Sequence, residues 1–313
     1  MGLLAVKLVL SWSQRPIAAR TAIHRERLAG IGVGVAIPMY NEDPAMLRAC
    51  LGSILEQTRS VASLVVVDDG SSDDRSVIEA ETWIPRFADA GIRMEVVRFA
   101  DNLGKREGLI ACLERQPDAD LLLCVDSDTV LDQHALERIL PPFLDDEVKV
   151  VTGLVLALNY RTNILTRLID LRYANAFLFE RAAYSALGSV LCACGSLAVY
   201  RTEVMRKYSH DFLTQTFLGQ PAIFGDDRRL TNYGLLEGKA LFQSNAIAYT
   251  AVPERSAITC ASRSAGTSHS CGSPCGSSDR CRSQSRRSGS RRSSSSPGRS
   301  SRRRSSSPSS SLP

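Results

Sequence analysis

The chain has 313 residues, of which 44% are hydrophobic, enough to bury the core of one large domain or two small ones. Its net charge of +5 is unevenly distributed, because residues 255–313 hold 12 arginines and a single acid. Residues 1–254 hold 26 basic and 32 acidic side chains. The excess of basic residues therefore belongs to the tail and does not indicate a nucleic-acid partner for the body.

The first 32 residues form an apolar and basic segment. A short apolar run covers residues 2–12, and four arginines follow it, Arg15, Arg20, Arg25 and Arg27. No window of the sequence reaches the roughly 18–20 apolar residues of a membrane span. The segment can be the cytoplasmic end of a truncated transmembrane helix, a short amphipathic anchor or an ordinary helix. We favour the first two interpretations.

Apolar runs and helical periodicities alternate from residue 33 onward. The expected strands are 33–38, 64–67, 94–99 and 121–125, and a further apolar run covers 149–157. The expected helices are 47–55, 104–115, 164–187 and one that opens within 224–232. This alternation implies βαβ units, and it predicts an α/β domain over residues 33–254 with a mostly parallel central sheet and flanking helices.

An acidic motif follows the expected fourth strand, where Asp126 and Asp128 flank Ser127. Two carboxylates at this spacing can share one hard divalent cation through oxygen ligands. For a lone pair of this kind, a solvated turn at a strand end is the more common explanation. The other polar motifs also follow strands, and sheets of this class bind ligands at the carboxyl ends of their strands. We therefore interpret the pair as a metal site.

Two further motifs suit a nucleotide. Asp68 and Asp69 follow the expected second strand, where their carboxylates could accept hydrogen bonds from a uracil N–H or a ribose hydroxyl. Their alternative role is an Asp-Gly turn. Lys105 and Arg106 open a helix after a glycine, which suits a diphosphate. The alternative there is a simple helix start with surface charges.

A third group of charges, Asp226, Asp227 and Arg228, lies far along the chain at an expected helix start. A carboxylate that faces an acceptor could take the proton from an attacking sugar hydroxyl. Helix capping is the alternative, since aspartate is favoured in a first helical turn.

Together these segments resemble the family-2 glycosyltransferases. The matching strings are Val35-Ala-Ile-Pro-Met-Tyr-Asn-Glu-Asp43, Val67-Asp-Asp-Gly-Ser-Ser-Asp73, Asn102-Leu-Gly-Lys-Arg106, Val125-Asp-Ser-Asp-Thr129 and Gly225-Asp-Asp-Arg-Arg-Leu-Thr-Asn232. The last string is the most specific and resembles hyaluronan synthases and rhizobial chitin-oligosaccharide synthases. The segments 192–201 and 249–254 also resemble parts of those enzymes. The resemblance covers residues 33–254.

The resemblance implies a nucleotide-sugar transferase of the GT-A type that inverts the sugar and uses a UDP-sugar with Mg²⁺ or Mn²⁺. It implies the following roles: Asp68 and Asp69 for the uridine, Lys105 and Arg106 for the diphosphate, Asp126 and Asp128 for the metal, Asp227 with Asp226 for general base catalysis, and Gly195 and Arg228 on the acceptor side. Asp128 is the expected direct metal ligand. A polysaccharide acceptor and a location at the cytoplasmic face of the cell membrane are implied as well.

Residues 255–313 depart from the family pattern. They are rich in serine and arginine without apolar periodicity, a composition that predicts disorder. The Gln-x-x-Arg-Trp string of processive members is absent from the sequence as written. Permitted codons for residues 260–276 encode such a string in a shifted reading frame. We therefore hypothesise a frameshift near residues 254–256, which the nucleotide sequence of the gene would decide.

Three functions stay open at this point. The first is hyaluronan synthesis from UDP-GlcNAc and UDP-GlcA, which we expect to be impaired in this form of the chain. The second is synthesis of a chitin-like oligosaccharide from UDP-GlcNAc alone, and the third is an inactive remnant that still binds UDP and metal. RNA binding by the arginine-serine tail is a weaker alternative, because no aromatic residues interleave with the arginines. We expect no nucleic-acid partner.

Overall fold

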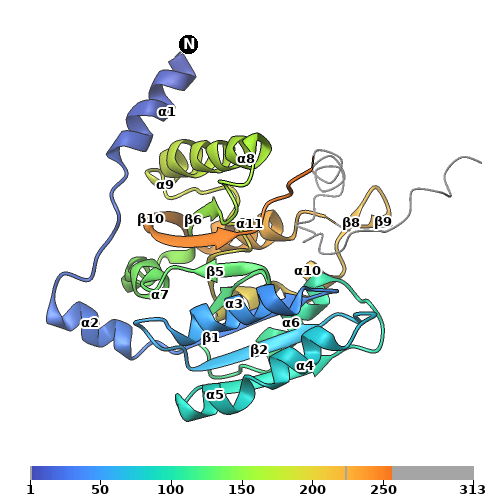
Figure 1. Ribbon diagram of the computed structural model, residues 1–313. Coiled ribbons are helices and arrows are strands. Elements are labelled where there is room, and N and C mark those ends of the chain that lie inside the picture. The colour runs from blue at the N-terminus through green and yellow to red at the C-terminus, as the bar shows by residue number, and fades with distance from the viewer. Residues whose placement is uncertain (1, 223, 256–313) are drawn as a thin grey trace, which may run out of the picture. The chain divides into compact units, whose positions relative to one another are not determined.

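The computed structural model describes residues 2–222 and 224–255. The predictions of a disordered tail and of a shifted reading frame concern residues that lie outside the described ones. Residues 33–250 hold every strand of the described part (Figure 1).

The main sheet of the described residues has eight strands in the order β3-β2-β1-β4-β7-β6-β10-β5. Their bounds are β1 Val33–Met39, β2 Ser63–Asp68, β3 Arg93–Arg98, β4 Leu121–Cys124, β5 Thr129–Leu131, β6 Val148–Ala157, β7 Ala198–Arg201 and β10 Lys239–Thr250. A separate hairpin joins β8 Thr216–Phe217 to β9 Gln220–Pro221. Four neighbouring pairs are parallel and three, all involving β7 or β5, are antiparallel. The predicted α/β sheet is thus confirmed as a mixed sheet.

The helices of the described residues flank this sheet. They are α1 Gly2–Ser13, α2 Ala22–Ala29, α3 Pro44–Leu55, α4 Arg75–Glu81, α5 Ile84–Asp89, α6 Lys105–Glu114, α7 Ala135–Ile139, α8 Ile164–Asn175, α9 Ala182–Ser185, α10 Thr202–Leu213 and α11 Asp226–Glu237, with a 3₁₀ turn η1 Pro141–Leu144. The helix predicted over 164–187 consists of α8, a π-helical segment η2 Ala176–Arg181 and α9.

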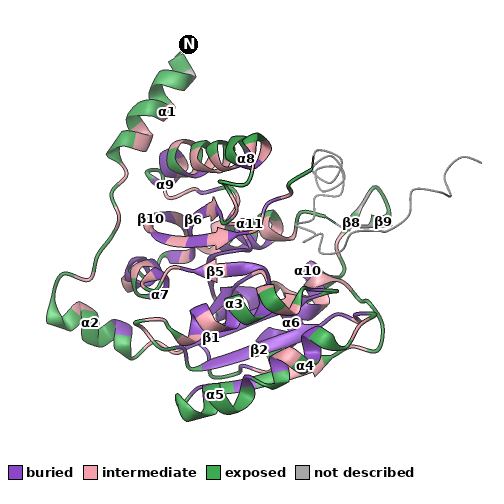
Figure 2. Ribbon diagram, in the orientation of Figure 1, coloured by how far each residue is buried: buried purple, intermediate pink, exposed green. Residues whose placement is uncertain are grey.

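The core lies in the first strands of the sheet. Every residue of β2 and β4 is buried, and β1 is buried except for Pro38, as the central band of buried strands in Figure 2 shows. Such strands read as continuous apolar runs because helices cover both of their faces. This explains why these strands could be predicted from the sequence with nearly correct bounds.

The order of the strands defines a switch point beside β1. The chain runs from β1 outward to β2 and β3, and then returns through α6 to β4 on the other side of β1. In open α/β sheets, ligands bind where the strand order reverses in this way, outside the carboxyl ends of the strands. The fold therefore favours a site between the ends of β1 and β4.

The N-terminal segment is attached to the far part of the sheet. The side chain of Gln14 donates to the carbonyl of Phe242 at 2.9 Å, and the amide of Ile17 donates to the side chain of Gln243 at 2.9 Å. None of the helices described between residues 2 and 255 is long and apolar enough to cross a membrane.

Candidate functional site

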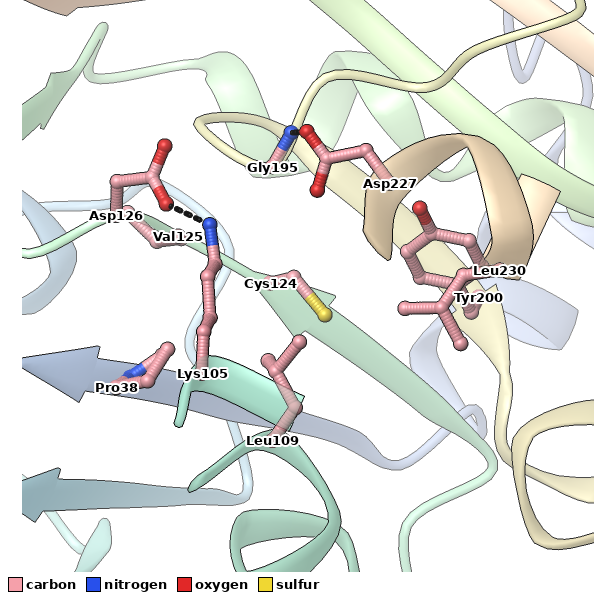
Figure 3. A pocket seen from close by; sticks show the side chains of 10 residues that line it. All are labelled: Pro38, Lys105, Leu109, Cys124, Val125, Asp126, Gly195, Tyr200, Asp227 and Leu230. Atoms are coloured by element: carbon pink, nitrogen blue, oxygen red, sulfur yellow. Dashed lines mark hydrogen bonds and ion pairs between the residues drawn. The ribbon is translucent and has the colours of Figure 1, made fainter. Parts of the chain in front are cut away.

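A pocket at the carboxyl ends of the strands brings the expected donor and acceptor motifs together (Figure 3). The residues that line it are Pro38, Lys105, Leu109, Cys124, Val125, Asp126, Gly195, Tyr200, Asp227 and Leu230. They come from β1, α6, the end of β4, the segment before β7, β7 itself and α11. The pocket therefore lies at the switch point of the sheet.

Lys105 occupies the centre of this pocket. Its Nζ lies 2.6 Å from Oδ1 of Asp126, and Figure 3 shows the same ammonium group pointing between Asp126 and the Gly195–Asp227 pair. Burial alone would lower the pKa of Lys105, but the carboxylates of Asp126 and Asp227 outweigh it and raise that pKa. The lysine is therefore a cation that lies between two acids and attracts both.

Asp126 and Asp128 lie two residues apart but in different surroundings. Asp126 accepts from Lys105 and, at 2.8 Å, from the hydroxyl of Ser196, and although its burial acts in the opposite direction, Lys105 lowers the pKa of Asp126. Burial, followed by the charges of Asp126 and Glu42, raises the pKa of Asp128 to about 7. The two carboxylates of one motif thus differ in proton affinity.

This acidic side of the site suits a divalent cation. Glu42 accepts a 2.6 Å hydrogen bond from Ser127, which places a third acid, itself buried, beside the motif. No group of three or more histidine, cysteine, aspartate or glutamate residues among those described is arranged to hold a metal by itself. Mg²⁺ is commonly bound by one or two carboxylates together with substrate phosphates and water. The oxygen ligands of Asp126 and Asp128 fit that kind of site.

Asp227 lies in the first turn of α11 and faces the segment before β7. Its Oδ2 accepts a hydrogen bond of 2.8 Å from the amide of Gly195. Burial raises the pKa of Asp227, while Lys105 and the Gly195 amide act in the opposite direction. A carboxylate whose pKa is raised is better suited to accept a proton than an exposed one.

The surroundings of Gly195 leave little room for a side chain. A Cβ atom there would lie 2.8 Å from Oδ1 of Asp227 and 3.1 Å from Nζ of Lys105. Any side chain would therefore displace either the acid or the cation. This residue, expected on the acceptor side, lies directly beside Asp227.

Asp68 and Asp69 end β2, and their carboxylates are already engaged. Asp68 is buried, accepts from the hydroxyl of Ser71 and forms an ion pair with Arg98. Asp69 accepts from the amides of Leu103 and Gly104, with distances of 2.7 to 3.1 Å. Burial raises the pKa of Asp69, and those amides oppose the rise. Both acids therefore shape the loops around the expected uridine site, and their contact with uridine stays a prediction.

Arg106 and Asp226 bind each other. The guanidinium of Arg106 is buried, pairs with the carboxylate of Asp226 and also donates to the carbonyl of Phe224 at 3.3 Å. The pair joins the start of α6 to the start of α11. Arg228 is exposed on α11 and lies next to the thiol of Cys192. Of the charged residues expected at the start of these two helices, only Lys105 and Asp227 line the pocket.

Four residues of the site were not predicted individually: Glu42, Ser196, Tyr200 and Thr231. Glu42, Ser196 and Thr231 lie inside strings that the resemblance covers, but their partners are 85, 70 and 38 residues away along the chain. Local patterns do not reveal such pairings. Tyr200 lies in the four-residue strand β7, which is buried and contributes to the pocket wall.

The chain is similar to known glycosyltransferases. A family model described as "Glycosyl transferase family 2" matches residues 34–209. A hyaluronan synthase of Streptococcus pyogenes is 41% identical over 250 residues, which are 80% of this chain and 58% of that protein. An N-acetylglucosaminyltransferase of Neorhizobium galegae is 36% identical over 225 residues, 71% of this chain and 51% of that protein. The chain thus spans a little over half the length of these relatives.

A solved structure supports the fold. The mannosyltransferase PcManGT from Pyrobaculum calidifontis, in complex with GDP-Man and Mn²⁺, aligns with a TM-score of 0.55 and 18% identity. The alignment covers 80% of this chain and 66% of that one. The predicted resemblance to glycosyltransferases of the GT-A fold is therefore confirmed.

Proposed function

Because this chain belongs to glycosyl transferase family 2, we propose that it transfers sugars from UDP-GlcNAc and UDP-GlcA to a growing polysaccharide, as a hyaluronan synthase does. The observation that carries the proposal is the position of Lys105, whose ammonium lies 2.6 Å from Asp126 and beside the acid Asp227. One pocket would thus join a cation for the diphosphate to a general base. The choice of donors is supported by the 41% identity to hyaluronan synthase.

On the donor side, Asp68 and Asp69 would hold the uridine and Lys105 the diphosphate. The Asp69 carboxylate accepts hydrogen bonds from the amides of Leu103 and Gly104, so it orders the loop that precedes Lys105. The first amides of α6 add partial positive charge near the same place. These groups would stabilise the negative charge that develops on the departing UDP.

The metal would be Mg²⁺ or Mn²⁺, held by Asp128 and Asp126 together with the diphosphate oxygens. When bound, such an ion neutralises charge on the leaving group. Ser127, between the two acids, donates to Glu42, and this bond holds the turn in place.

On the acceptor side, Asp227 would act as the general base. The acceptor hydroxyl oxygen forms a bond to the anomeric carbon while the bond from that carbon to UDP breaks. The electron pair of the broken bond leaves with UDP, and the hydroxyl proton moves to Asp227. The Gly195 amide keeps the second carboxylate oxygen in place at 2.8 Å. Arg228 and Gly195 would face the acceptor, while Asp226 stays paired with Arg106.

A second candidate is supported by the 36% identity to an N-acetylglucosaminyltransferase. Under it, the same machinery would use UDP-GlcNAc alone, because small changes in a pocket are enough to alter donor selection. A third candidate is a protein that binds UDP and metal without transfer. A location at the cytoplasmic face of the cell membrane stays a prediction.

Incubation with labelled UDP-GlcNAc, with and without UDP-GlcA, separates these candidates. We expect labelled polymer only when both donors and Mg²⁺ or Mn²⁺ are present, and in low yield from this form of the chain. Labelled oligosaccharide from UDP-GlcNAc alone would replace the proposal by the second candidate. Binding of UDP without any transfer product would replace it by the third.

A further inference from the structure

Residues 193–196, here called the bridge segment, connect the acceptor side of the pocket to β7. Three successive amides of this segment donate to side-chain oxygens of other elements. Ala193 donates to Oγ1 of Thr231 at 2.8 Å, Cys194 to Oγ1 of Thr152 at 3.1 Å, and Gly195 to Oδ2 of Asp227 at 2.8 Å. The backbone of the bridge segment is therefore held by α11 and β6 together.

The fourth residue of the bridge segment reaches the other side of the site. Ser196 donates its hydroxyl to Oδ2 of Asp126 at 2.8 Å. Asp126 and Asp227, expected to act on the donor and on the acceptor, are thus connected through two neighbouring residues, Gly195 and Ser196. A shift of the bridge segment relative to α11 would change the position of one acid with respect to the other.

Thr231 is the buried residue that fixes this segment to α11. Its side chain has no exposure to solvent. Its hydroxyl donates to the backbone carbonyl of Asp227, one helical turn earlier, at 2.6 Å, and accepts from the amide of Ala193. One hydroxyl supplies both the donor and the acceptor that these two bonds need. It therefore ties the backbone of the expected base to the segment that binds the base's carboxylate.

We propose that Thr231 is a positioning residue for Asp227, and that its hydroxyl sets the placement of the Asp227 carboxylate against the Gly195 amide. The inference rests on the proposed function only in naming Asp227 as the base. The space beside Gly195 is tight, with room for no Cβ between Asp227 and Lys105. A small displacement of the bridge segment is enough to move the base, and misplacement of about 1 Å can cost roughly a hundredfold in rate.

Two substitutions of Thr231 test the role of its hydroxyl, one that keeps the shape of the side chain and one that keeps the hydroxyl. Thr231→Val keeps the branched shape and removes the hydroxyl, whereas Thr231→Ser keeps the hydroxyl and removes the methyl group. We expect Thr231→Val to lower kcat by about tenfold to a hundredfold, with the KM for the UDP-sugar within about twofold. Thr231→Ser should keep kcat within about threefold of the wild type. Equal losses in the two variants, or a loss expressed in KM alone, would overturn the proposal.

Amide hydrogen exchange provides a second readout that does not depend on sugar transfer. Thr231→Val should increase exchange not only at Ala193, which loses its direct partner, but also at Gly195, whose partner is Asp227. Thr231→Ser should leave both amides protected. Protection of Gly195 that is unchanged in Thr231→Val overturns the proposal, even if the wild type transfers no sugar and the proposed function has failed. If Thr231→Val does not fold, Thr231→Ala replaces it.

Discussion

The two sides of Asp126 differ in how their charge is balanced. On one side Lys105 lies between Asp126 and Asp227, so that a cation of the protein itself separates two acids. On the other side Asp128 faces Asp126 and Glu42, and Lys105 has only a minor influence on it. The pKa values report this difference, since that of Asp126 is lowered and that of Asp128 is raised to about 7.

This difference indicates what each side requires. The Lys105 side carries its own cation. The Asp128 side tends to hold a proton near neutral pH. Ionisation of several carboxylates that face one another in a buried site costs free energy, because their charges repel. A divalent cation in place of that proton would relieve the repulsion. We therefore expect the first side to depend on its side chains and the second on metal and pH.

The largest effect should come from Asp227→Asn. Asparagine keeps the shape of the aspartate side chain and can still accept a hydrogen bond from the Gly195 amide, but it cannot take a proton from the acceptor. We expect kcat to fall by about 10³-fold, which corresponds to about 4 kcal/mol of barrier. Transfer kinetics with both donors measure it, and unchanged UDP affinity is the control. Near-normal kcat would remove Asp227 from the role of base.

Asp226→Asn tests the neighbouring acid, which is balanced by a different cation. The substitution leaves the buried guanidinium of Arg106 without its carboxylate, and loss of one partner of a buried pair costs about 3 kcal/mol or more in stability. We expect a lower free energy of unfolding by about that amount in urea titrations.

Activity per folded molecule should fall much less in Asp226→Asn than in Asp227→Asn, because Asp226 does not line the pocket. The reverse result, a stable variant without transfer, would assign the base to Asp226. The two substitutions together therefore distinguish an acid that acts on the acceptor from one that joins α6 to α11.

The sequence predicted the donor side better than the acceptor side, for physical reasons. Asp68 ends the buried strand β2 and Asp126 comes shortly after the buried strand β4, and an apolar run that ends in a polar turn is visible locally. Their position at one edge of the sheet follows from parallel strand order. The same patterns could not show that Asp69 caps the loop before α6, because its partners lie 34 and 35 residues away.

The acceptor side depends on pairings that only the folded chain creates. Strand β7 has four residues and pairs antiparallel with both β4 and β6, which no local periodicity predicts. The bridge segment before it is held by Thr231 and Thr152 from elements 38 and 42 residues away. The resemblance to a family placed Gly195 and Asp227 near the acceptor, but it did not indicate their hydrogen bond.

Lys105→Met tests whether the Lys105 side of Asp126 needs its cation. Methionine keeps most of the side-chain volume and leaves Asp126 and Asp227 without the charge between them. We expect kcat/KM for the UDP-sugar to fall by about 10²-fold, since an electrostatic stabiliser of the leaving group is lost. Lys105→Arg keeps the charge and should lose less. Equal losses in both variants would show that the geometry of the lysine matters more than its charge.

On the acidic side, we expect a stability that depends on metal and pH. Without metal, the wild type should lose stability relative to Asp128→Asn as the pH rises from about 4 to about 7. The free energy of unfolding falls over this range because the pKa of Asp128 is raised to about 7 in the folded chain. The folded state there holds a proton that the unfolded state has already released.

Mg²⁺ or Mn²⁺ should reverse this loss. At about pH 8, a free ion concentration of ten times the Kd should stabilise the wild type by about 1.4 kcal/mol, measured as a rise in Tm. The rise should fade as the pH falls through about 7, since protonation of Asp128 competes with the ion. Asp128→Asn should show neither the metal effect nor its pH dependence. An equal rise in that variant would place the ion away from Asp128, and the two sides of Asp126 would then differ in pKa without differing in metal affinity.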